Sequence, residues 1–179
     1  MPDAPPPYAE LYCRSNYSFL VGASEPEELV ERAAAKLYAA IALTDECSVS
    51  GVVRAHLAAR ECGNHFIVGP KLLLTTAGGH AHAPIVFLAQ DRRGYGNLSE
   101  AITVARPRAE KGRYLSQVAD FEGKTAKAPH LAGLPGCLAL LLPEPDETVE
   151  TLFAKAMWLK TWFEGRAWLL EPRPLGLDD

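Results

Sequence analysis

The sequence lacks several features that would assign it to a familiar class of protein. It contains no apolar run of about 18 residues, so we expect no membrane-spanning helix and no membrane partner. The opening MPDAPPPYAE has neither the basic segment nor the apolar core of a signal peptide, which favours a cytoplasmic protein. The glycines form neither G-x-G-x-x-G nor a phosphate-binding loop, which argues against a nucleotide-binding domain.

Cysteine pairs and excess positive charge are also missing. The four cysteines lie far apart without a C-x-x-C pair, a pattern typical of reduced thiols. The formal net charge is −4 at pH 7, so the composition does not indicate a nucleic-acid-binding surface. If the protein acts on DNA, we expect that another part of it binds the DNA.

What the sequence does contain is enough apolar material for a folded core. Its 179 residues are 48% hydrophobic and 22% charged, ordinary values for a globular domain. Pro5, Pro6 and Pro7 predict a stiff, extended segment at the start. We therefore expect a proline-rich lead-in over residues 1–7 and one domain over residues 8–179.

Short apolar runs alternate with helical patterns along the chain. Ser24-Glu25-Pro26-Glu27 is typical of a capped helix start, and helical spacing continues to about Tyr38. This alternation favours an α/β fold with parallel strands covered by helices, and both a barrel and an open doubly wound sheet fit it. Further strands are predicted at 39–44, 65–69, 71–76, 84–90, 137–142 and 167–171, and further helices at 52–60, 91–106 and 147–163.

Polar side chains gather where the first two strands end. The stretch YAELYCRSNYSFLVGAS, residues 8–24, predicts a short strand, a polar loop and the start of a helix. The second strand ends at Thr44-Asp45-Glu46. Since α/β enzymes keep their chemistry where strands lead into helices, Asp45 and Glu46 are candidate site residues. Alternatively, they are a carboxylate pair that favours the dipole at a helix N-terminus.

These blocks resemble a known family. YAELYCRSNYSFLVGASEPEELVERA, IALTDECSVSGVVRAH and FIVG are similar to the opening of the polymerase and histidinol phosphatase (PHP) domain of bacterial C-family DNA polymerases, relatives of the DNA polymerase III alpha subunit. With LAQDRRGYGNLSEAIT, the resemblance is closest to the error-prone, ImuC-type branch. It covers residues 8–179 and implies a distorted β/α barrel, incomplete at the C-terminus, with the polymerase domains absent.

The resemblance also implies where metal ligands would stand. In the family, strand-end ligands hold two or three metal ions that activate water against a phosphoester. The histidine pair of the first motif corresponds to Tyr12 and Arg14, and the acidic residue before the turn glycine corresponds to Val21. The histidine of Thr-Asp-His corresponds to Glu46, and the glutamate of Gly-x-Glu corresponds to Lys71.

Most of the implied ligands are therefore replaced. Asp45 and Glu46 remain as vestigial metal ligands, and we expect no catalytic residue and no cofactor in this segment. Arg14 and Lys71 bring positive charge to the implied site, and a like charge about 4 Å away costs about 4 kcal/mol at an effective dielectric of about 20. We expect Arg14 and Lys71 to form ion pairs with Asp45 and Glu46. The degenerate metal-site positions are Tyr12, Arg14, Val21 and Lys71.

The function that the resemblance implies is that of a PHP segment of an error-prone DNA polymerase in damage-induced DNA synthesis and repair, with a structural role in this segment. Its partners would be the remaining polymerase domains, in cis or in trans, and DNA through the full-length enzyme. Magnesium would serve those polymerase domains. Two alternatives stay open: a residual metal-dependent phosphoesterase (pyrophosphatase or 3′–5′ exonuclease), and a free-standing PHP-like interaction module.

Overall fold

A computed structural model describes residues 7–172, and the chain divides after Lys71 into two compact units. Apart from Pro7, the predicted lead-in lies outside the described residues, as do residues 173–179. The division into a lead-in and one domain therefore stays a prediction. Within residues 7–172, no helix is both long enough and apolar enough to cross a bilayer.

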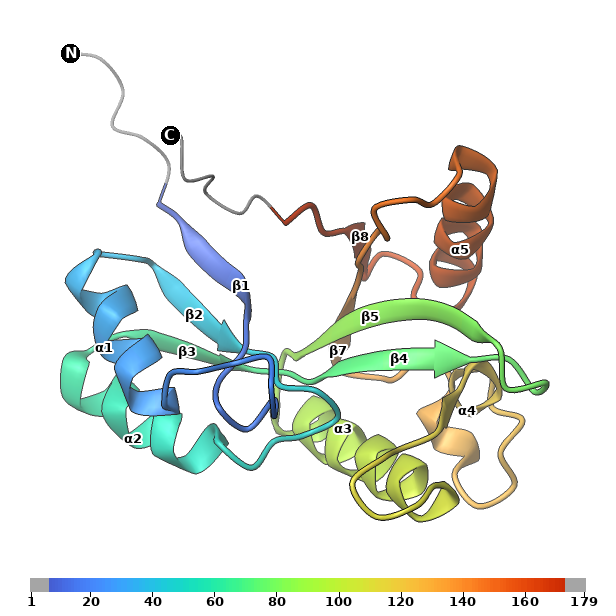
Figure 1. Ribbon diagram of the computed structural model, residues 1–179, viewed down its shortest axis with the longest axis horizontal. Helices are drawn as coiled ribbons and strands as arrows, with labels where there is room; N and C mark the ends of the chain where they lie inside the picture. The colour runs from blue at the N-terminus through green and yellow to red at the C-terminus, as the bar shows by residue number, and fades with distance from the viewer. Residues whose placement is uncertain (1–6, 173–179) are drawn as a thin grey trace. The chain divides into compact units, whose positions relative to one another are not determined.

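The first unit is a parallel sheet with two helices (Figure 1). Its strands lie in the order β1-β2-β3, and both neighbouring pairs run parallel. The carboxyl ends of the three strands therefore meet at one edge of the sheet, which is the edge that holds the candidate residues. The elements are β1 (Ala9–Cys13), α1 (Pro26–Ala35), β2 (Ala40–Leu43), α2 (Val52–Cys62) and β3 (His65–Val68).

The ends of α1 differ from the sequence-based expectation. The capping box joins Glu25 and Glu28, one residue later than predicted, and the backbone N–H of Glu25 donates to the Glu28 carboxylate at 2.9 Å. The helix ends at Ala35 and not near Tyr38, because Leu37 has a left-handed φ of 58°. In contrast, α2 begins at Val52 as predicted and ends at Cys62, two residues after the predicted end, where Gly63 follows in the left-handed conformation.

Small side chains let the two helices of the first unit pack closely together and against the sheet. Ala55, Ala58 and Ala59 of α2 are buried with Val30 and Ala33 of α1. Every residue of β2 is buried, as expected for the central strand of a covered parallel sheet.

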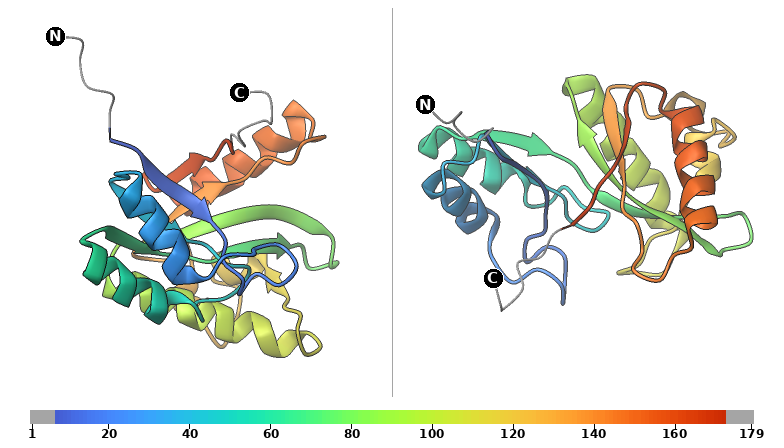
Figure 2. Two further views of the ribbon diagram at one scale, coloured as in Figure 1. Left: turned by 60° about the vertical axis from the view of Figure 1, so that its left-hand side comes forward. Right: turned by 90° about the horizontal axis from the view of Figure 1, so that it is seen from above.

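The second unit is a five-stranded mixed sheet in the order β6-β4-β5-β7-β8. Within residues 72–172 this sheet does not close on itself, and α3 and α5 lie on opposite faces of it (Figure 2). Its elements are β4 (Lys71–Thr75), β5 (Ala81–Ala89), α3 (Arg92–Ala105), the 3-10 turn η1 (Arg106–Arg108), β6 (Ser116–Gln117), α4 (Val118–Phe121), η2 (Pro129–Leu131), β7 (Cys137–Leu141), α5 (Val149–Trp162) and β8 (Ala167–Leu169).

The expectation of parallel strands is confirmed only in part for this sheet. β5 pairs with β7 in the antiparallel direction, whereas the pairs β4–β6 and β7–β8 are parallel. The chain reverses in the turn between Thr76 and His80, where Gly79 has a φ of 77°. A tight turn is enough to reverse a strand, whereas a parallel neighbour needs a long crossover.

Three phenylalanine rings form the centre of the second core. Phe87 of β5 stacks on Phe121 with ring centroids 5.1 Å apart, and Phe163 lies 5.7 Å from Phe87. All three are fully buried. Leu159 and Phe163 are therefore core residues, while Trp158 and Trp162 are only half-buried.

Candidate functional site

The candidate residues lie in two loops at the carboxyl edge of the first sheet. Asp45 and Glu46 follow β2 directly, and Ser15 and Ser18 lie in the loop after β1. Since α2 begins only at Val52, the two carboxylates do not stand at a helix N-terminus, and that alternative is wrong.

Asp45 is a buried carboxylate held by neutral donors. The residue is only 1% exposed to solvent. Oδ1 accepts from the backbone N–H of Ser15 at 2.8 Å and from Ser18 Oγ at 2.7 Å. Oδ2 accepts from Ser15 Oγ at 2.7 Å. Three of roughly four lone-pair sites of the carboxylate are therefore occupied by protein donors.

The two serines were visible in the sequence only as part of a polar loop, and their role as a clamp on Asp45 was not predicted. Ser15 and Ser18 are both buried. Ser18 Oγ also accepts from the backbone N–H of Glu46 at 3.0 Å, so that one hydroxyl connects both candidate carboxylate residues. A buried Ser-x-x-Ser after a strand, with an aspartate at the end of the next strand, is the signal that could have indicated the clamp.

Glu46 forms the predicted ion pair with Lys71. Nζ of Lys71 lies 3.0 Å from Oε2 of Glu46, and both side chains are half-buried. Backbone hydrogen bonds hold the pair in place: Lys71 N–H donates to Asp45 O at 3.0 Å, and Cys47 N–H donates to Lys71 O at 2.9 Å. The ammonium group therefore lies beside one of the two remaining candidate ligands.

The pairing predicted for Arg14 is wrong. Its guanidinium lies over the ring of Tyr12, 5.1 Å from the centroid, which is cation–π geometry. The acceptor oxygens of Asp45 are engaged by serines instead. Val21, the third replaced position of the first loop, has an exposed side chain. Tyr12 thus lies in β1 and Arg14 and Val21 in the loop that follows it, and neither loop residue reaches a candidate carboxylate through an ion pair.

These side chains do not form the donor set of a metal cluster. Among residues 7–172, no three His, Cys, Asp or Glu side chains come together in a way that could hold an ion. A divalent ion at Asp45 would compete with the serine donors for the carboxylate, and one at Glu46 would lie close to an ammonium group. Whether Asp45 and Glu46 keep any metal affinity stays a prediction.

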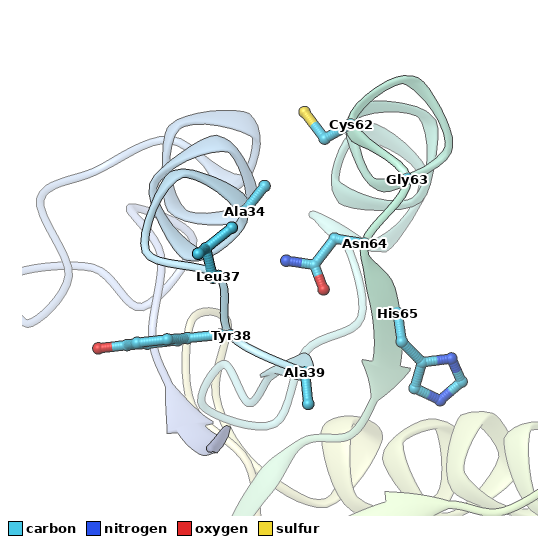
Figure 3. Close-up of a pocket in the computed structure, with 8 residues that line it drawn as sticks. All are labelled: Ala34, Leu37, Tyr38, Ala39, Cys62, Gly63, Asn64 and His65. Carbon is cyan, nitrogen blue, oxygen red and sulfur yellow. The ribbon is translucent and has the colours of Figure 1, made fainter. Parts of the chain in front are cut away.

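A cavity of about 380 Å³ lies at the opposite edge of the same sheet, at the start of β3 (Figure 3). The Asn64 carboxamide lies between the carboxyl ends of α1 and α2, and Tyr38 and Cys62 are among the lining residues. Because this edge holds the amino ends of β2 and β3, the cavity is separate from the Asp45 loops.

The chain is similar to known proteins over most of its length. The family model of the PHP domain matches residues 10–160. The "Error-prone DNA polymerase" of Bordetella parapertussis is 51% identical over 164 residues, which are 92% of this chain and 16% of that protein. The protein of the same name from Ralstonia nicotianae is 47% identical over 175 residues, 98% of this chain and again 16% of the relative. The chain therefore spans about one sixth of the length of these curated relatives.

Among solved structures, an amidohydrolase from Chromobacterium violaceum has a similar fold. The TM-score is 0.60 at 17% sequence identity, and the match covers 89% of this chain and 75% of that one. At this identity the likeness concerns the fold alone. Together with the family match, it confirms the predicted α/β fold of the PHP type.

Proposed function

This chain belongs to the PHP domain family, and we propose that it forms the PHP region of an error-prone DNA polymerase that acts in damage-induced DNA synthesis and repair in the bacterial cytoplasm. The proposal is supported by relatives of that name, which are 51% and 47% identical over most of this chain. Nucleotide addition and its magnesium ions are assigned to the remaining polymerase domains, and DNA is contacted through the full-length enzyme.

Within that polymerase, we assign this region a structural role. The observation that carries this assignment is the state of the two candidate carboxylates: Asp45 accepts three hydrogen bonds from Ser15 and Ser18, and Glu46 lies 3.0 Å from Lys71. Activating water against a phosphoester requires metal ions with open coordination positions. Carboxylates already bonded to protein donors and to an ammonium group favour a scaffold over a phosphoesterase.

Metal stoichiometry tests whether this region has a structural role and no metal-dependent activity. The purified chain is titrated with Mn²⁺ and Zn²⁺ beside an Asp45→Asn, Glu46→Gln variant, which keeps the shapes of both side chains. We expect wild type and variant to bind equally little metal. Tight binding that disappears in the variant would support the alternative function, a residual metal-dependent phosphoesterase. Pyrophosphatase and 3′–5′ exonuclease assays would then identify its activity. Lys71→Glu restores the acidic residue of the third motif and is the variant expected to gain affinity.

A segment exchange tests whether this chain is the PHP region of an error-prone DNA polymerase. The matching segment of the Bordetella parapertussis relative is replaced by this chain, and DNA synthesis on a primed template is compared with that of the unaltered relative. We expect the exchange to preserve synthesis, including the ability to extend past damaged bases. A full-length chimaera that is folded but inactive would contradict the proposal.

A further inference from the structure

The loop between β1 and α1 exposes three consecutive large apolar side chains. Phe19, Leu20 and Val21 are 84%, 90% and 57% exposed. Single exposed apolar residues are common on protein surfaces, but adjacent ones mark sites of interaction. The tip of this loop is therefore a candidate docking surface.

The loop is held in one shape by its own backbone. Val21 N–H and Gly22 N–H both donate to Ser18 O at 2.9 Å, and Asn16 N–H donates to Ser24 O at 2.8 Å, which closes the base of the loop. A Cβ atom on Gly22 would lie 1.9 Å from the carbonyl oxygen of Ser15, so only glycine fits there. The apolar tip is thus presented without the entropy loss of ordering a flexible loop on binding.

The loop is also anchored to the candidate site. Ser18, directly before Phe19, donates to Asp45 Oδ1 at 2.7 Å and accepts from Glu46 N–H at 3.0 Å. Ser15 provides two further hydrogen bonds to Asp45. The buried carboxylate that the sequence suggested as a vestigial metal ligand therefore has a present role, which is to hold the base of this loop.

Leu20 is the least expected residue in the loop. Its φ of 63° lies in the left-handed region, where glycine and asparagine are favoured and a bulky side chain is strained. A leucine that is strained and almost fully exposed does not stabilise the first unit. Unlike an isolated strained leucine, Leu20 lies between two further exposed apolar side chains, and this combination points to binding.

The charge around the tip indicates what kind of partner it fits. Residues 15–24 carry no charged side chain, and the guanidinium of the preceding Arg14 lies over the ring of Tyr12 in the strand β1. Arg54 hydrogen-bonds to Glu25 and Glu27, and Lys71 pairs with Glu46. Phosphate contacts need available Lys or Arg side chains, so the tip fits an apolar protein surface better than DNA. The curated relatives extend far beyond the 16% of their length that this chain matches.

We propose that Phe19, Leu20 and Val21 dock into an apolar depression on the polymerase body that forms the remainder of those relatives. This inference rests on the proposed function and names the surface through which the PHP region supports the body. Leu20 fills the depression, and the Asp45 clamp fixes its direction of approach.

The experiment compares Leu20→Gly in two settings: the isolated chain and the full-length chimaera with the Bordetella relative. Glycine relieves the strain at this φ, so the isolated chain should have an unchanged or higher Tm. In the chimaera the same substitution removes a docked side chain, so its Tm should fall. Phe19→Ser, which relieves no strain, should lower the Tm of the chimaera and leave that of the isolated chain unchanged.

Hydrogen exchange gives a second measurement that does not depend on thermal unfolding. The amides of residues 19–21 should exchange at least about tenfold more slowly in the chimaera than in the isolated chain, and Leu20→Gly should remove that difference. Equal exchange in both settings, or a Tm that responds with the same sign in both, would overturn the inference.

Leu37 is a matched control in the same unit. It is also 90% exposed and also has a left-handed φ, of 58°, at the carboxyl end of α1. Leu37→Gly should leave the Tm unchanged or raise it in both settings. A fall in the chimaera equal to that of Leu20→Gly would mean that the loop is not a specific docking surface.

Measurements on the isolated chain test two other possible partners of the loop tip, a second copy of the chain and DNA. Concentration-dependent sedimentation that Leu20→Gly abolishes would assign the tip to a second copy of the chain, and DNA binding lost in the same variant would assign it to nucleic acid. Either result would overturn the inference. If the chimaera synthesises DNA but is indifferent to Leu20→Gly, the docking surface fails while the proposed function stands.

Discussion

Asp45 in the first unit and Asp120 in the second are both buried carboxylates, but their partners differ in charge. Asp45 accepts from Ser15 and Ser18, all neutral donors. Asp120 receives two hydrogen bonds from the guanidinium of Arg108, at 2.6 and 2.8 Å, and others from Thr125 Oγ1 and from the backbone N–H of Gln117.

The difference shows two ways of keeping a carboxylate in a protein interior. A bidentate arginine neutralises the charge and matches the geometry of the carboxylate. Hydroxyl and amide donors disperse the charge without neutralising it, and a hydroxyl can also rotate to accept a hydrogen bond from a neutral amide. The stability of the second unit should therefore depend on a particular charge, and that of the first on the number of hydrogen bonds.

The largest expected effect is that of Arg108→Met. The side chain of Asp120 is only 3% exposed, so loss of the guanidinium leaves a buried carboxylate without its cation. Breaking such a pair from one side costs about 3–5 kcal/mol, and the lower end applies here because the Arg108 side chain is 25% exposed. Urea unfolding of the full chain measures the change. Arg113→Met, at an exposed position, should change the free energy of unfolding by less than about 0.5 kcal/mol.

An isosteric substitution at both carboxylates tests the comparison directly. Asp120→Asn places an amide N–H₂ against the guanidinium and should cost about 2 kcal/mol, in the range for a hydrogen bond to a charged group. Asp45→Asn should cost about 1 kcal/mol, because a serine hydroxyl can rotate to accept from the new amide. Equal losses in urea unfolding would show that partner charge does not distinguish the two sites. A larger loss at Asp45 would reverse the comparison.

Local patterns in the sequence predicted most of the elements of the fold. Apolar runs gave the positions of β2, β5 and β7, and the start of α2 at Val52 was also predicted. The direction of β5 was missed because an apolar run reads the same in a parallel or antiparallel sheet. The turn at Gly79 contained the necessary signal, since a tight turn reverses the strand that follows it.

The candidate site was predicted less completely. The Lys71–Glu46 ion pair followed from the opposite charges that the family resemblance places at the implied metal site. The serine clamp did not, because Ser15 and Asp45 are 30 residues apart in the chain and a serine in a loop has many other partners available. Arg14 was paired with a carboxylate by charge alone, whereas the aromatic face of Tyr12 is the partner nearer in the chain. Charge alone thus predicted the partner of Lys71 but not that of Arg14, and it could not predict the hydrogen bonds from neutral serines.

The smallest expected effect is a difference in acid sensitivity. Burial raises the pKa of Asp120, but hydrogen bonds from Arg108, Thr125 and Gln117 outweigh it and hold the pKa below the usual range. A carboxylate with a depressed folded-state pKa contributes stability that is present above its unfolded pKa of about 3.9 and is lost as pH falls through the folded value. In Arg108→Met the burial effect is opposed only by the hydrogen bonds from Thr125 and Gln117, so this contribution should shrink.

The chain has 22 acidic residues that titrate in the same range, so the informative quantity is the difference between two curves. Unfolding free energies of wild type and Arg108→Met are measured from about pH 7 to about pH 2. The two curves should converge as the pH falls, whereas those of wild type and Arg113→Met should stay parallel. The convergence should be smaller than the loss at neutral pH, because a protonated Asp120 can still accept from Thr125 and Gln117. Parallel curves for Arg108→Met would mean that Asp120, like Asp45, is held mainly by neutral donors.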